Sequence, residues 1–167
     1  MFGQKLPSVS KIIQATMPSE QRAILDRWEA NKIAELGEDG FQQMKQELFR
    51  HGHELHYSVE EYFRDTGSEF RAYLKADGDP TVENLIHSLA PVIDEFQRPA
   101  LSLESQVIHP TLNYVGYFDA LAYHKKSKKV VLIDWKTSEK KKSTLAKTYD
   151  APFQVAAYVG ALNHDAR

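Results

Sequence analysis

Apolar residues recur at intervals of three or four through the first hundred positions, which is the spacing of helices that bury one face. Residues typical of helix ends interrupt this pattern, with serine or threonine before the apolar runs and glycine or proline after them. The pattern predicts four helices: a short one capped by Ser8 or Ser10, one from Ser19 to near Gly37, one from about Phe41 to Arg64, and one capped by Thr81, kinked by Pro91 and closed before Pro99. Residues 1 to about 99 are therefore expected to form a helical region.

Beyond Pro99 the apolar positions change to the short β-branched and aromatic runs that are typical of strands. Three strands are expected, from Leu101 to Ile108, over 114–123 and over 129–135. The short polar segment between the last two predicts an antiparallel hairpin, and a final helix should begin near Pro152. This order predicts a mixed α/β (α+β) fold, with a three-strand antiparallel meander flanked by helices in one domain over residues 1–167.

Both faces of the predicted hairpin are apolar. One face carries Phe118, Ala120, Ala122, Val131, Ile133 and Trp135, and the other carries Leu121, Tyr123, Val130 and Leu132. Strands with two apolar faces are usually covered by helices on both sides. Charged residues on these strands are therefore expected at the edge of a core.

Two aspartates and a lysine are expected to meet on this hairpin. If its tip lies at residues 126 and 127, the numbers of opposed residues sum to 253, so Asp119 faces Asp134, and alternation places Lys136 beside them. Carboxylates opposed at about 5 Å destabilise a sheet unless something neutralises them. Mg²⁺ or Mn²⁺ prefers such oxygen ligands. The alternative is a structural Asp–Lys–Asp ion cluster.

Composition and charge narrow the possible functions. The 167 residues include no cysteine, which excludes disulfides, thiolate metal sites, cysteine nucleophiles and iron–sulfur clusters. No apolar stretch approaches the roughly 20 residues that cross a bilayer, so no membrane partner is expected. The net charge of −2 conceals a basic block, because residues 125–147 carry nine lysines and two acidic residues. Such a block indicates either a polyanion-binding face or a solvated lysine-rich turn.

Five elements, in order along the chain, resemble the PD-(D/E)XK nucleases of the RecB type. They are Gly52 to His56 as Gly-x-x-x-His, Glu104 on the strand before the aspartate, Asp119 after Gly-Tyr-Phe, Asp134-x-Lys136, and Gln154-x-x-x-Tyr158. The resemblance implies a restriction-endonuclease-like core and hydrolysis of DNA phosphodiesters with Mg²⁺ or Mn²⁺.

The same resemblance implies a role for each residue. Asp119 and Asp134 would bind the metal, and the backbone carbonyl of Trp135 and His56 would complete its ligands. Lys136 would orient the attacking water and offset charge in the transition state, which agrees with the physics of metal-assisted hydrolysis. Glu104 could bind a second metal or hold a metal-bound water. Gln154 and Tyr158 would touch a phosphate or a base, although such a pair is more often an ordinary core edge.

Further stretches are similar to a mitochondrial branch of this family that digests single-stranded DNA in DNA maintenance, replication and repair. They are residues 6–10, 16–20, 35–39, 134–139 and 163–165. This branch implies a monomer in the mitochondrial matrix, acting at free ends of single-stranded DNA. Its members continue beyond the final helix of this chain, so the C-terminal part of the fold is expected to be missing.

Other polar and aromatic residues are candidates for DNA binding. Lys140, Lys141, Lys142 and Lys147 are expected near the mouth of a narrow passage that admits a single strand. Arg22, Trp28, Lys32 and Tyr57 could form a stacking and phosphate-binding wall, although most aromatics at helical spacing belong to a core.

The run of histidines from His51 to His56 does not fit the zinc-protease motif, which needs two histidines four apart. His51 and His53 are interpreted as surface residues, and only His56 as a site residue. A further alternative for the whole chain is a nucleic-acid-binding module that keeps the fold without the reaction. The presence of Asp119, Asp134 and Lys136 together favours the enzyme.

Overall fold

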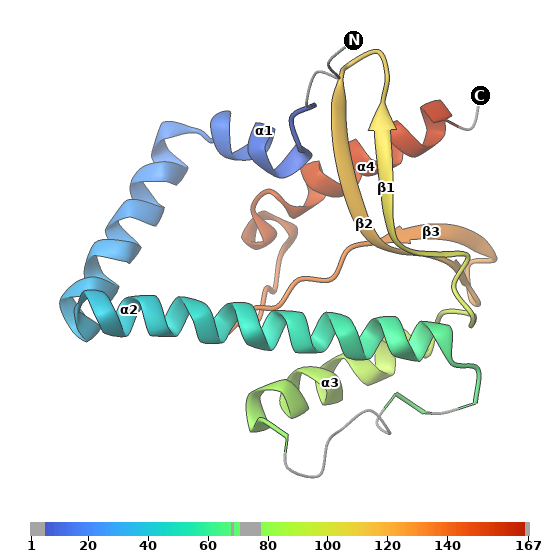
Figure 1. The fold of residues 1–167 in the computed structure, drawn as a ribbon, viewed down its shortest axis with the longest axis horizontal. Helices are drawn as coiled ribbons and strands as arrows, with labels where there is room; N and C mark the ends of the chain where they lie inside the picture. Colours follow the sequence, from blue (N-terminus) through green and yellow to red (C-terminus); the bar gives the residue numbers. More distant parts are fainter. Residues whose placement is uncertain (1–5, 68, 71–77, 166–167) are drawn as a thin grey trace.

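A computed structural model describes residues 6–67, 69–70 and 78–165 of the protein. The first helix, α1 (Val9–Ala15), is capped by Ser8, whose hydroxyl accepts a hydrogen bond from the Lys11 amide. The second, α2 (Ser19–Arg64), contains both long helices that the sequence predicts, joined by a sharp bend (Figure 1). The bend lies at Gly37, whose φ of 74° is open to glycine at little cost.

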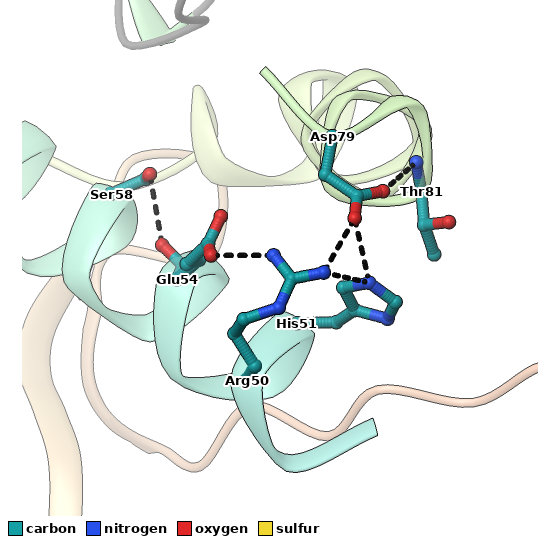
Figure 2. Close-up of polar contacts among 6 residues, drawn as sticks. All are labelled: Arg50, His51, Glu54, Ser58, Asp79 and Thr81. Carbon is teal, nitrogen blue, oxygen red and sulfur yellow. Dashed lines mark hydrogen bonds and ion pairs between the residues drawn. The ribbon is translucent and has the colours of Figure 1, made fainter. Parts of the chain in front are cut away.

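Helix α3 (Pro80–Ile93) begins two residues earlier than a Thr81 cap would place it. Its cap is Asp79, whose Oδ1 accepts a hydrogen bond from the Thr81 amide at 2.8 Å, so the prediction of a Thr81 cap was wrong. Proline at the first helical position fixes the helical φ, which leaves the residue before it as the cap. The same carboxylate holds α3 against α2, since Arg50 and His51 both bind its Oδ2 (Figure 2).

The three strands form one antiparallel sheet in the order β1–β2–β3, as predicted. They are β1 (Ser102–His109), β2 (Tyr114–His124) and β3 (Lys129–Ile133). Pairs such as Ala120 with Ile133 and His124 with Lys129 confirm the predicted register of the hairpin. β3 is shorter than predicted, because regular pairing ends at Ile133 and the chain leaves the sheet over 134–138.

Helices cover both faces of the sheet, as the two apolar faces of the hairpin predicted. On one side, residues of α2 and α3 pack against the strands in a core that includes Phe63, Ile86, Ala120 and Ala122. On the other side, α1 and α4 (Ala151–Asp165) pack in a second core. Figure 1 shows the long second half of α2 below the sheet, with α3 beneath it and α4 behind the strands.

The predicted position of Phe118 was wrong. Phe118 belongs to the core beneath α4 and not to the face of Ala120 and Ala122. The change of face coincides with an irregularity in the neighbouring strand, where Glu104 has a φ of 45° and is skipped between two regular pairs. Strict alternation is therefore lost where Asp119 lies.

Within the described part of the chain, no helix has the length and apolar character needed to cross a membrane.

Candidate metal centre

Three side chains that could bind a metal ion converge from three different elements. They are His56 of α2, Glu104 of β1 and Asp119 of β2, and one ligand atom from each lies within 4.8 Å of the other two. His56 Nδ1 is 3.5 Å from Asp119 Oδ1. One imidazole nitrogen and two carboxylates form a ligand set that suits Mn²⁺ or Mg²⁺.

Local structure determines where each of these side chains begins. His56 follows the buried Leu55 on α2, so its ring points out at the edge of that core. Asp119 lies between the buried Phe118 and Ala120, and its Oδ2 accepts a hydrogen bond from the Trp135 amide. The left-handed backbone at Glu104 is uncommon for a residue with a side chain, and it lies opposite Asp119 in the register.

Asp134 and Lys136 stand beside this group, directly after β3. The Asp134 side chain is 3% exposed, and the Lys136 Nζ lies 2.5 Å from its Oδ2 as an ion pair. That oxygen receives no hydrogen bond of regular geometry from the described residues. A buried carboxylate oxygen that lacks such a donor is a good ligand for a cation.

The charges of the site are poorly compensated. Burial raises the pKa of Glu104, and the carboxylates of Asp119 and Glu60 raise it further. Burial also raises the pKa of Asp134, against the opposing effect of Lys136. The hydrogen bond to Asp119 raises the pKa of His56. A divalent cation would favour the ionised carboxylates, so the donor chemistry of His56, Glu104 and Asp119, with the buried carboxylate of Asp134, fits the metal that the sequence predicts.

A pocket of about 460 Å³ opens over two of the three ligands. It is lined by Leu48, Phe49, Gly52, His53, His56, Tyr57, Glu60, Glu104 and Thr137. Sequence reasoning missed Phe49, Glu60 and Thr137. The position of Glu60, four residues after His56 on a helix, was the signal that could have found it.

The PD-(D/E)XK nuclease superfamily profile matches residues 8–167 of the chain. The chain belongs to this superfamily. It is similar to the protein named "Mitochondrial genome maintenance exonuclease 1" in three species. The identities are 39% over 165 residues in Mus musculus, 40% over 162 residues in Homo sapiens and 38% over 167 residues in Xenopus tropicalis.

These alignments cover 96%, 96% and 99% of the chain but 45%, 44% and 45% of the relatives. The chain thus spans less than half the length of these relatives. Their name and the superfamily match support a nuclease role.

The remaining motif of this PD-(D/E)XK chain, Gln154 and Tyr158, lies on α4. Tyr158 is only 3% exposed and belongs to the core between α4 and the sheet, where Gly116 leaves room for its ring. Its hydroxyl accepts a hydrogen bond from Gln154 Nε2 at 2.6 Å. The prediction that Tyr158 touches DNA is not supported, because burial removes its ring from any strand. Its contact with Gln154 makes it a positioning residue for that half-buried amide.

The other predicted DNA-binding residues of the PD-(D/E)XK chain fall into two groups. Lys140, Lys141, Lys142 and Lys147 are exposed on the segment that joins β3 to α4. Arg22 donates to the Gln14 carbonyl at 2.8 Å, and Trp28 packs edge-on against Phe41. Neither Arg22 nor Trp28 lines the pocket over the ligands, whereas Tyr57 does. The predicted stacking wall is therefore not brought together as one surface at this pocket.

The two other histidines of the run have different surroundings. The interpretation of His51 as a surface residue was wrong, since its side chain is 13% exposed and its Nε2 lies 2.9 Å from Asp79 Oδ2 (Figure 2). His51 lies on the side of α2 that faces α3, and the periodicity of apolar residues in the sequence could not show which side that is. His53 is exposed, and it lines the pocket beside His56.

Proposed function

We propose that this chain carries the catalytic centre of a metal-dependent exonuclease that hydrolyses single-stranded DNA from free ends. The observation that carries the proposal is the convergence of His56, Glu104 and Asp119 under an open pocket, with Asp134 and Lys136 alongside. The names of the relatives support a place in mitochondrial DNA maintenance, and thus in the matrix. The enzyme is proposed to act as a monomer.

Asp119, Asp134, His56 and the backbone carbonyl of Trp135 would hold the metal, and Glu104 would hold a second ion or a water. Bound Mg²⁺ or Mn²⁺ would supply positive charge for the transition state and acidity for the attacking water. The Trp135 amide fixes Asp119 through Oδ2 and leaves Oδ1 for a ligand, on the side of His56. Asp119 is thus held in place before substrate arrives.

Lys136 is proposed to act on the substrate. It is half exposed at 50%, while its partner Asp134 is buried, so the ammonium lies between the core and the solvent. In this position it can orient the attacking water and stabilise the charge that develops on the phosphate oxygens. The lysines at 140–142 and 147 would attract the strand through its phosphates.

The proposal is tested with the full-length enzyme on linear and circular single-stranded DNA of one sequence. Mg²⁺-dependent release of nucleotides is expected from the linear strand, with the circle intact, because a passage that threads one strand needs an end. Asp134→Asn should abolish release from the linear strand. Comparable cleavage of the circle would show an endonuclease, and no release from either would leave only a binding module. Digestion of a linear RNA of the same sequence, measured alongside, shows whether the enzyme distinguishes DNA from RNA.

A further inference from the structure

Three ring side chains lie one helical turn apart along α2. Phe49, His53 and Tyr57 are spaced by four residues, which places them on one face of the helix. Phe49 is 75% exposed and Tyr57 is 57% exposed, and the rings of Phe49 and His53 are 6.3 Å apart. Large exposed aromatics in a row are unusual on a surface that has no partner. We call this row the aromatic track.

The aromatic track is continuous with the candidate metal centre. All three of its residues line the same pocket as His56 and Glu104. His56 lies on the same helical face, between the second and third rings. A molecule that lay along the track would therefore reach the metal ligands without crossing a barrier of side chains.

The side of α2 opposite the aromatic track is held by polar contacts to Asp79 and by the hydrophobic core. The exposure of the rings therefore does not result from loose packing of the helix. Arg50 binds Glu54 and Asp79, and His51 binds Asp79 as well, on the side of α2 turned to α3 (Figure 2). Leu55 and Val59 are buried in the core on that side. The rings are thus carried by a rigid helix whose other face is satisfied.

The spacing of the rings fits nucleic acid bases. Four residues of helix rise about 6 Å, which is close to twice the separation of about 3.4 Å between stacked bases. Because the planes of Phe49 and His53 are inclined by 42°, a base would stack on the face of one ring and not between the two. The exposed lysines at 140–142 follow three residues after Thr137, which lines the pocket, so a strand that leaves the pocket along this segment would meet positive charge for its phosphates.

We propose that Phe49, His53 and Tyr57 form a base-stacking track that guides the terminal nucleotides of single-stranded DNA to the metal centre. This inference rests on the proposed function and names residues for its substrate. The track is tolerant of sequence, since every base has a flat face to stack. It selects for unpaired bases, because a base in a duplex cannot lie against a ring of the protein.

The test is the affinity of the full-length enzyme, with Ca²⁺ in place of Mg²⁺, for a thymidine oligonucleotide and for an abasic strand with the same phosphates. Phe49→Ala and Tyr57→Ala should each weaken thymidine binding by about tenfold, the order of one lost stacking contact. Binding of the abasic strand should not change. Tyr57→Phe keeps the ring and should bind as wild type does. Tyr117→Ala removes a similarly exposed tyrosine outside this pocket and should have no effect.

Equal weakening for both strands would overturn the track, since it would show that the variants harm phosphate binding or the fold. Unchanged thymidine binding would also overturn it, and would indicate that another segment of the longer protein covers the rings. Failure of the proposed function is distinct, because wild-type enzyme would then not digest linear DNA in Mg²⁺. That result would overturn the proposed function and the track together.

Discussion

The environment of Asp134 is unfavourable for a charged carboxylate. Its side chain is almost fully buried, its Oδ2 lacks a regular hydrogen bond, and burial raises its pKa. Asp134 directly follows the last regular pair of the hairpin, and the nearby Asp119 carboxylate also raises its pKa. Lys136 compensates only in part, because it is itself half exposed. The proposed cation would offset these charges, and the carboxylates are expected to destabilise the fold when that cation is absent.

Asp134→Asn is expected to raise the stability of the metal-free protein by roughly 0.5–1 kcal/mol, the scale of a relieved cross-strand repulsion. Asp119→Asn should leave the fold intact, since an amide oxygen can still accept from the Trp135 amide. Both variants should lose the rise in melting temperature that Mn²⁺ gives wild type. Thermal unfolding with and without Mn²⁺ measures both effects. If either variant is unfolded in the absence of metal, the replaced carboxylate has a structural role, which would contradict the proposed site.

The gain from Asp134→Asn should depend on pH in a defined direction. Because the folded-state pKa of Asp134 is raised, the folded state binds more protons than the unfolded state between the two pKa values. Wild-type stability therefore falls as pH rises through that range. The variant's advantage should be full at pH 7.5 and vanish as pH falls to about 4, near the ordinary carboxyl pKa. Unfolding in metal-free buffer at several pH values checks this, and an advantage that grows toward acid pH would contradict it.

Lys136→Ala should lower turnover by about 10²–10³-fold, the usual cost of removing one transition-state donor. DNA affinity should change little, because many other lysines contact phosphates. Lys140→Ala is the matched control and should weaken binding modestly without a large loss of turnover. Single-turnover digestion and equilibrium binding by the full-length enzyme separate the two quantities. Equal losses in both for Lys136→Ala would place this lysine in the binding surface.

Among the elements, the close packing of α4 on β2 decides what Tyr158 does. A Cβ added at Gly116 would lie 2.4 Å from the Tyr158 Cε1, so only glycine lets the ring rest on the strand. The ring in turn holds its hydroxyl against Gln154. The helix is thereby fixed with its half-buried amide in a set orientation.

Gly116→Ala is expected to destabilise the protein by about 1–3 kcal/mol, as overpacking does in a tight core. Gly160→Ala, on α4, is the control, since its added Cβ would make only an ordinary contact with Tyr114 at 3.5 Å. That change should be neutral or slightly stabilising, because alanine favours helix. Urea unfolding compares the two. An unchanged midpoint for Gly116→Ala would show that Tyr158 does not rest on the strand.

Sequence periodicity was sufficient for the helices and for the register of the hairpin, because both follow from local spacing. It failed where tertiary contacts decide. Phe118 changed face at an irregularity in the neighbouring strand, and Tyr158, for which contact with DNA and a core edge were both open, lies in the core. His51 faces α3, and Phe49 faces the pocket, although both lie on one helix. No single-sequence pattern gives the side of a helix that another helix will cover.

The distribution of charge over the whole molecule matches the proposed reaction. Acidic ligands collect at one point between α2 and the sheet, while the lysines gather on the segment between β3 and α4. This arrangement would hold a cation at the centre and phosphates around it. The chain nevertheless spans less than half of its relatives, so tests of activity belong in the longer protein.

The most direct test of the metal centre is anomalous diffraction from crystals grown with Mn²⁺. A peak is expected within bonding distance, about 2.0–2.3 Å, of ligand atoms of Asp119 and Asp134, with His56 or Glu104 beside it. The same crystals of Asp119→Asn should show no peak there. A wild-type structure with Mn²⁺ in solution but no density between these side chains, or with the ion bound elsewhere, would contradict the proposed site.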